Sequence, residues 1–220
     1  MCAPMRIAYL VDVHDRFNAV ADAMRAIGEA DLLLIGGDIT TGGTPDQAAA
    51  AIERWRPLAP RLLALAGNMD SPAIDTRLAD LGVALDARGY RLGDVGVFGV
   101  SAAPRSPLRT PYELSEDELG RRIEDGFAAV RDCSVKVFCP HAPPRGTSCD
   151  RLRSGEHVGS TAVRSFVERE QPDVVLCGHI HEARALDSIG DTQVVNPGPV
   201  GAGHYAVVDI DDVVAVRLDP

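Results

Sequence analysis

Hydrophobic positions in the first third of the chain alternate between short continuous runs and stretches with helical spacing. Three continuous apolar runs predict buried strands: residues 7–11, 32–35 and 62–66. Residues 16–28 carry apolar side chains at helical spacing, and Thr44-Pro45-Asp46-Gln47 forms a capping box for a helix that ends near Pro57. Ser71-Pro72 opens a third helix, which Gly82 ends. This alternation predicts parallel strands joined by right-handed crossovers.

The rest of the chain mixes hairpins with helices. Residues 90–100 are glycine-rich and predict a hairpin, and residues 101–111 form a proline-rich loop. Ser115-Glu116-Asp117-Glu118 is a second capping box, and residues 160–170 predict the last helix. Further strands are predicted from six apolar runs: residues 135–139, 174–177, 183–189, 193–195, 205–210 and 213–218. We expect an α/β fold with a mixed pair of sheets covered by helices, in a single domain of residues 1–220.

Composition narrows the class of protein. The chain has 220 residues, 45% hydrophobic and 25% charged, which is ordinary for a soluble globular protein. Its five cysteines lack Cys-x-x-Cys spacing, which argues against a disulfide framework or a zinc knuckle. We expect no signal peptide in residues 1–6 and no membrane span, and therefore a cytoplasmic location.

The charge balance bears on partners. The net charge is −10, whereas nucleic-acid binding usually needs a basic face and anionic membranes repel acidic proteins. We therefore expect neither nucleic acid nor membrane as a partner. An anionic substrate stays compatible with this charge, because bound metal ions would invert the field locally.

Metal-binding residue types follow directly on several of the predicted strands. In chain order they are Asp12-Val13-His14, Gly37-Asp38, Gly67-Asn68-Met69-Asp70, His141 and Gly178-His179-Ile180-His181. Ligands of open α/β sheets bind outside the carboxyl ends of the strands, so we expect these segments to converge at one edge of the sheet. Four of the six histidines of the chain occupy such positions, which random placement would not produce.

Converging aspartate, histidine and asparagine would offer both nitrogen and oxygen ligands. Such a mixture suits Mn, Fe, Co, Ni or Zn. Seven ligands exceed the needs of one tetrahedral ion and suit two ions that share a carboxylate. Two ions about 3.5–4 Å apart clamp the attacking and leaving oxygens of an in-line displacement, and a shared water loses its proton near pH ~7. The pattern therefore predicts a hydrolytic centre with hydroxide as its nucleophile.

In order and context these motifs resemble those of the calcineurin-like metallophosphoesterases, over residues 7 to about 200. Three more segments are similar to a prokaryotic branch of predicted phosphoesterases: Pro140-His141-Ala142-Pro143-Pro144, His157-Val158-Gly159-Ser160 and Val195-Asn196-Pro197-Gly198. The resemblance implies a four-layer α/β/β/α sandwich of two mixed β-sheets flanked by helices. It also implies two groups of metal ligands bridged by Asp38: Asp12, His14 and His181 for one ion, and Asn68, His141 and His179 for the other.

Met69 departs from the family motif, which usually has histidine at this position. In the family that histidine is thought to contact the substrate phosphate and to help the leaving group depart. A thioether cannot donate a proton, and general-acid catalysis typically contributes roughly 10²–10⁴-fold. We therefore expect slow hydrolysis of esters with poor leaving groups, and faster hydrolysis of activated esters or diesters.

Several other polar residues have two open interpretations. Arg145 either clamps a substrate phosphate bidentately or is a solvated arginine, and His157 either contacts substrate or caps the helix that begins near residue 160. Asn68 is a metal ligand or belongs to an ordinary Gly-Asn turn. Asp70 fits a helix-start charge or a hydrogen-bond acceptor behind the ligands better than a ligand.

The function that we expect is a binuclear metal-dependent phosphoesterase. It would use two divalent transition metal ions and hydrolyse a small phosphomonoester or phosphodiester by attack of a metal-bridging hydroxide. The alternative is a catalytically weak metal-binding scaffold or interaction protein with the same fold, which Met69 favours. A metalloenzyme acting on a non-phosphate ester is a third possibility. The sequence leaves the substrate, the native metals and the oligomeric state open.

Overall fold

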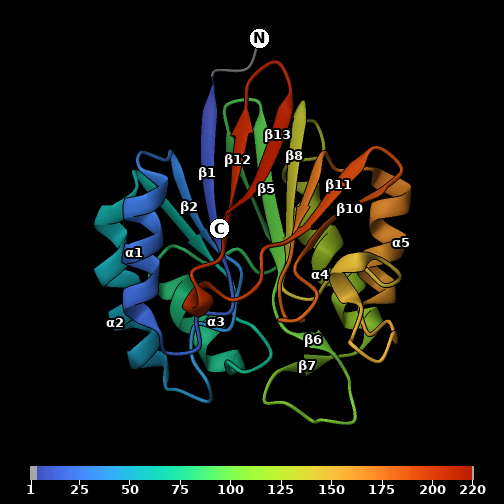
Figure 1. Ribbon diagram of the computed structural model, residues 1–220, viewed down its shortest axis with the longest axis horizontal. Coiled ribbons are helices and arrows are strands. Elements are labelled where there is room, and N and C mark those ends of the chain that lie inside the picture. The colour runs from blue at the N-terminus through green and yellow to red at the C-terminus, as the bar shows by residue number, and fades with distance from the viewer. Residues whose placement is uncertain (1–3, 220) are drawn as a thin grey trace.

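Two β-sheets face each other in the middle of the molecule, and helices cover their outer faces (Figure 1). The computed structural model describes residues 4–219. The five-stranded sheet has the order β13-β12-β1-β2-β3, with β1 (Met5–Leu10), β2 (Leu32–Ile35), β3 (Arg61–Ala64), β12 (Tyr205–Ile210) and β13 (Val214–Asp219). The six-stranded sheet has the order β10-β11-β9-β8-β5-β4, with β4 (Arg88–Leu92), β5 (Val95–Val100), β8 (Val135–Pro140), β9 (Val174–Leu176), β10 (Ala185–Ile189) and β11 (Thr192–Asn196).

The helices divide between the two sheets. Three cover the five-stranded sheet, α1 (Phe17–Ile27), α2 (Pro45–Trp55) and α3 (Pro72–Asp80), and two cover the six-stranded sheet, α4 (Glu116–Ala128) and α5 (Thr161–Glu170) (Figure 1). Three single turns of 3-10 helix are η1 (Arg56–Leu58), η2 (Ser148–Asp150) and η3 (Val200–Ala202). Thr44 and Ser115 form the predicted capping boxes, which fixes where α2 and α4 begin.

Burial on both faces of each sheet explains why the strands read as continuous apolar runs. In β1, Ile7 and Tyr9 pack between the sheets, whereas Ala8 and Leu10 pack under α1 and α2. The six-stranded sheet adds Val97 and other residues to the core between the sheets, and its outer face packs on α4 and α5. The α/β fold with two mixed sheets and flanking helices is confirmed.

Parallel strands bring their carboxyl ends to one end of the molecule. β1, β2 and β3 pair in parallel in one sheet, and β5, β8 and β9 do so in the other. Gly178, after β9, lies against Val11, after β1, so the two sheet edges meet. The ligand segments therefore come from the edges of two sheets, whereas the sequence had predicted the edge of one.

Two very short strands could not be predicted from the sequence pattern. The loop at residues 101–111 contains β6 (Ala103–Pro104), which pairs in parallel with β7 (Glu113–Leu114). Two-residue strands are too short to show a period.

Four cysteines, Cys133, Cys139, Cys149 and Cys177, are buried and free, and Cys2 lies outside the described residues. Among residues 4–219, every helix is too short or too polar to cross a bilayer.

Candidate metal centre

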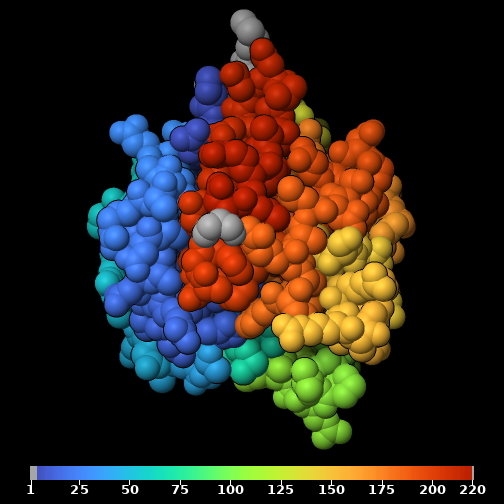
Figure 2. Space-filling view, viewed as in Figure 1, coloured from blue at the N-terminus to red at the C-terminus, as the bar shows by residue number. Residues whose placement is uncertain are grey.

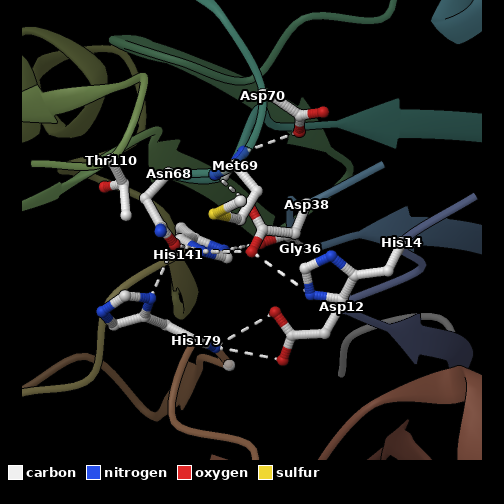
Figure 3. A network of polar contacts seen from close by, with 12 residues as sticks. Asp12, His14, Gly36, Asp38, Asn68, Met69, Asp70, Thr110, His141 and His179 are labelled. Atoms are coloured by element: carbon white, nitrogen blue, oxygen red, sulfur yellow. Dashed lines mark hydrogen bonds and ion pairs between the residues drawn. The ribbon is translucent and has the colours of Figure 1, made fainter. Parts of the chain in front are cut away.

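Side chains from five loops point toward one another where the two sheet edges meet (Figure 3). Asp12 and His14 follow β1, Asp38 follows β2, and Asn68 follows β3. The other three come from the six-stranded sheet: His141 follows β8, and His179 and His181 follow β9. All seven predicted ligands thus lie at this junction.

The first group of potential ligands consists of Asp12, His14, Asp38 and His181. One ligand atom from each lies within 4.8 Å of the others. Nε2 of His14 is 3.1 Å from Nε2 of His181 and 3.4 Å from Oδ2 of Asp38. Nε2 of His181 is 3.7 Å from Oδ1 of Asp12, and this contact raises the pKa of His181, so a cation here would compete with a proton. The spacing of these nitrogen and oxygen atoms fits one cation placed among them.

The second group consists of Asn68, His141 and His179. Oδ1 of Asn68 lies 3.0 Å from Nε2 of His141 and 2.7 Å from Nδ1 of His179. Oδ2 of Asp38 lies 3.7 Å from Nε2 of His141. Because the same oxygen is 3.4 Å from His14, the Asp38 carboxylate lies between the two groups.

The hydrogen bonds of His141 leave a nitrogen lone pair directed at this junction. Its Nδ1 is 2.9 Å from the carbonyl of Gly36, which can only accept, so Nδ1 carries the proton. Burial lowers the pKa of His141, so the ring holds a single proton and Nε2 is unprotonated. That lone pair faces Oδ1 of Asn68 and Oδ2 of Asp38, which are acceptors as well. A cation would relieve this crowding of lone pairs, and a backbone carbonyl behind the ring is the usual support of a metal-binding histidine.

Burial also sets the charge of the other ligands. It lowers the pKa of His14 and brings the pKa of His179 to about 3, so both imidazoles are neutral and can bind a metal. Burial, with Asp12 and Asp70 nearby, raises the pKa of Asp38 well above its ordinary value. A buried carboxylate with this shift gains from a nearby cation, and the donor set fits divalent transition metals.

The backbone is strained at four of the ligand positions. Asp12, His14, Asp38 and His179 have φ between 46° and 66°, a region that residues other than glycine seldom adopt. Such conformations cost about 1–3 kcal/mol each and cluster at functional sites. The side chains at these four positions point into the junction of the two sheet edges (Figure 3).

Two glycines of the motifs are required for close approach. A Cβ at Gly67 would lie 2.1 Å from Oδ1 of Asp38, and a Cβ at Gly178 would lie 2.3 Å from Val11. No side chain fits at either position without moving a ligand loop. This gives a physical reason for glycine before Asn68 and before His179.

Asp70 holds two of the loops together from behind. Its buried carboxylate accepts hydrogen bonds from the N–H groups of Ile39, Thr40 and Gly67 and from the hydroxyl of Thr40. The loops that carry Asp38 and Asn68 are thereby fixed relative to each other. Asp70 is a hydrogen-bond acceptor behind the ligands, as the sequence had favoured.

Comparisons with known proteins show the family of this chain. The sequence profile described as calcineurin-like phosphoesterase matches residues 5–183. This chain belongs to the calcineurin-like phosphoesterase family. It is 30% identical over 201 residues to uncharacterized protein MJ1162 of Methanocaldococcus jannaschii, covering 89% of this chain and 88% of that protein.

Solved structures share the fold of this family member at low sequence identity. The crystal structure of TT1561 of Thermus thermophilus has a TM-score of 0.76 at 16% identity, with 99% of both chains covered. A dimetal phosphatase from Danio rerio has a TM-score of 0.65 at 12% identity, covering 97% of this chain and 95% of that one. Phosphopantetheinyl hydrolase from Mycobacterium tuberculosis has a TM-score of 0.61 at 14% identity, with 88% and 89% covered.

Met69, the departure from the family motif, lies directly beside the candidate ligands (Figure 3). Its N–H donates a hydrogen bond of 2.7 Å to Oδ1 of Asp38. The backbone of this residue therefore orients the carboxylate between the two groups, while the thioether supplies no proton. Substitution of the side chain leaves this backbone contact available.

Asn196 supports the loop of His179 and His181, a role that the sequence did not signal beyond the similarity of its motif. Its side-chain amide is fully buried and donates to the carbonyls of Ile180 at 2.9 Å, Cys149 at 3.2 Å and Gly178 at 3.4 Å. Gly178 and Ile180 flank His179. Asn196 thus ties the strained turn at His179 to the loop that follows His141.

The two residues predicted to contact substrate lie in the loop after β8. Arg145 is exposed, and its backbone pairs with that of Ser160. Nδ1 of His157 is 2.6 Å from the buried Asp150, which also accepts from the N–H groups of Gly146, Thr147 and Gly159. Neither Arg145 nor His157 is among the described residues that line the pocket at Asp12, His14 and His181. Their contact with substrate stays a prediction.

Proposed function

We propose that this chain is a metal-dependent phosphoesterase that hydrolyses a phosphomonoester or phosphodiester with two divalent transition metal ions. Seven residues would hold the ions: Asp12, His14, Asp38, Asn68, His141, His179 and His181. The observation that carries the proposal is the position of the Asp38 carboxylate, whose Oδ2 lies 3.4 Å from His14 and 3.7 Å from His141. One carboxylate between two groups of nitrogen and oxygen ligands suits a pair of ions.

When bound, two such ions lower the pKa of a shared water and neutralise charge on the phosphoryl oxygens. The chain itself fixes the positions of the ligands through Asp70, Asn196 and the Gly36 carbonyl. The thioether of Met69 cannot protonate a leaving group, so activated esters and diesters are the favoured substrates. Similarity in fold to a dimetal phosphatase and to a phosphopantetheinyl hydrolase supports phosphate-ester chemistry.

Hydrolysis of p-nitrophenyl phosphate and bis-p-nitrophenyl phosphate tests the proposal. Each is measured with added Mn²⁺ and with a chelator, beside metal content per chain. We expect metal-dependent release of nitrophenol that Asp38→Asn and His141→Ala abolish, with Asp22→Asn on the exposed face of α1 as the control. Absence of turnover with less than one ion bound per chain would favour a scaffold or interaction protein with the same fold instead.

A further inference from the structure

A pocket of 320 Å³ adjoins the first group of ligands. Its lining includes the candidate ligands Asp12, His14 and His181 together with Arg16, Pro199 and Gly201. Its size is at the lower end for small-molecule sites. In Figure 2 the blue surface of the N-terminal part of the chain meets the orange-red surface of the segment near residue 200 on one face of the molecule. A substrate held at the candidate metal centre would extend into this pocket past His14 and His181.

Arg16 brings an unpaired charge to this pocket. Its side chain forms no hydrogen bond or ion pair within residues 4–219. The neighbouring carboxylate of Asp15 accepts from the N–H of Thr41 at 3.1 Å, so it is directed elsewhere. Arg25, further along α1, pairs with Asp22. In a chain with net charge −10, a guanidinium beside a ligand cluster that pairs with none of the described carboxylates is suited to an anion from outside the protein.

Gly201 lies next to Arg16 in the pocket and leaves room for its side chain because glycine has none of its own. A Cβ at Gly201 would lie 3.0 Å from Cδ and 3.3 Å from Cγ of Arg16. η3, which carries Gly201, lies beside α1. Glycine at this position allows the stem of Arg16 to lie against η3. Among the described residues that line the pocket, Asp12 is the one acidic group, and it belongs to the ligand cluster.

We propose that the substrate is a phosphate ester with a second anionic group, a carboxylate or a phosphate, which Arg16 binds in this pocket. The inference rests on the proposed function of the metal centre. A guanidinium binds either oxyanion through two parallel N–H···O bonds. The metal centre would hold the phosphate to be hydrolysed, and Arg16 would select among esters by the group at the far end.

A set of matched p-nitrophenyl diesters tests whether Arg16 binds a second anionic group of the substrate. Three p-nitrophenyl phosphodiesters differ only in the end of a three-carbon alkyl chain, which is a carboxylate, a phosphate or a neutral N-methylamide. We expect the Mn²⁺-loaded protein to hydrolyse at least one charged ester with a kcat/KM about 10- to 100-fold above that of the amide, mainly through a lower KM. The carboxylate and phosphate arms distinguish the two anions.

Variants then assign the preference to Arg16. Arg16→Met should remove most of the ratio between charged and neutral esters, and Arg16→Lys should retain part of it. Gly201→Ala, which crowds the arginine stem, should lower the ratio while the charge of the pocket stays the same. Arg25→Met, within α1, is the control and should leave the ratio unchanged.

Equal kcat/KM for all three esters, or a preference that Arg16→Met leaves intact, would overturn the role of Arg16 while the phosphoesterase stands. No metal-dependent hydrolysis of any of the three would overturn the proposed function as well.

Discussion

Met69 is the residue at which the chemistry of this chain differs most from the usual motif of its family. The thioether stands at the position where the family motif usually has histidine, a possible proton donor, whereas the N–H of Met69 already orients Asp38. Replacement of the side chain therefore separates proton donation from ligand geometry.

We expect Met69→His to raise the rate for esters with poor leaving groups and to change the rate for p-nitrophenyl esters little. A positioned general acid typically contributes roughly 10²–10⁴-fold, and a loop not built for the imidazole should recover about the lower end. The measurement is phosphate release from alkyl phosphates and from p-nitrophenyl phosphate, with Met69→Gln as the matched polar control. An equal change for both leaving groups would contradict this interpretation.

Asn196 should matter for metal affinity because it fixes the turn at His179. We expect Asn196→Ala to weaken Mn²⁺ binding by about 10–100-fold, since residues that support metal ligands have effects of this size. It should also destabilise the fold by about 1–3 kcal/mol, because buried carbonyls lose their donor. Isothermal titration beside thermal unfolding separates the two effects. Asn18→Ala, at an exposed position of α1, is the control. Unchanged Mn²⁺ affinity in Asn196→Ala would contradict the supporting role of Asn196.

The raised pKa of Asp38 predicts how metal affinity depends on pH. Its raised pKa means that it still holds a proton at pH values where an ordinary aspartate is ionised, and a metal must displace that proton. His181, whose pKa is raised by Asp12, also holds a proton that a metal must displace. Affinity should therefore rise with pH and level off only above the raised pKa values of both groups. His179, with a pKa of about 3, does not compete for protons in this range. Titrations between about pH 5.5 and 8 in buffers of different ionisation enthalpy measure the released proton, and a flat affinity would contradict the account.

Sequence predicts these residues unevenly. Residue type and position after a strand were enough to name the seven ligand candidates. The Gly36 carbonyl, the Thr41 hydroxyl next to His14 and the N–H of Met69 were not predictable, because backbone groups and lone hydroxyls carry no pattern. The role proposed for Arg16 was not predicted either, because an exposed arginine at a helix start looks like any solvated charge.

At the scale of elements, strands buried on both faces and capped helices were the predictable parts. The capping boxes at Thr44 and Ser115 placed α2 and α4 closely, since a side chain must bond a specific N–H. The pairing of β6 with β7 depends instead on contacts within a long loop, which local patterns do not encode.

Glu113, in β7, holds the two ends of the loop at residues 104–113 together through hydrogen bonds from Ser106 and Thr110; we call this arrangement the closed loop. Burial opposes its ionisation, but hydrogen bonds from the N–H and hydroxyl groups of Ser106 and Thr110 lower its pKa to about 2. The depressed pKa means that the contribution of the carboxylate is present above the unfolded pKa and is lost only as pH falls through about 2. The loop should therefore stay closed at neutral and mildly acidic pH.

We expect Glu113→Gln to speed hydrogen exchange of residues 104–113 and to lower the free energy of unfolding by less than about 1 kcal/mol, because the site is only partly buried and solvent screens the charge. The preceding residue, Tyr112, donates its N–H to the carbonyl of Asn68, so a modest loss of Mn²⁺ affinity should follow. Glu53→Gln, another exposed acid, is the control. Unchanged exchange in residues 104–113 would show that Glu113 does not close the loop.

At the scale of the whole molecule, the two sheets share a core and bring their carboxyl edges together, so metal binding should stabilise both. We propose that residues 1–220 form one domain that unfolds in a single transition. Ligand present at about 100 times its Kd adds roughly 2.7 kcal/mol, which corresponds to a Tm increase of about 5–10 °C for a chain of this size.

Calorimetry with Mn²⁺ and after chelation measures that shift. Asp38→Asn should reduce the shift strongly, and Asp22→Asn should not. Two separate transitions would contradict the single domain, and an unchanged Tm would contradict metal binding to the folded protein.

Anomalous diffraction from crystals loaded with Mn²⁺ tests the central claim most directly. The account predicts two peaks about 3.5–4 Å apart with the Asp38 carboxylate between them, one near His14 and His181 and the other near Asn68, His141 and His179. A single peak, or none among these side chains at saturating Mn²⁺, would contradict it.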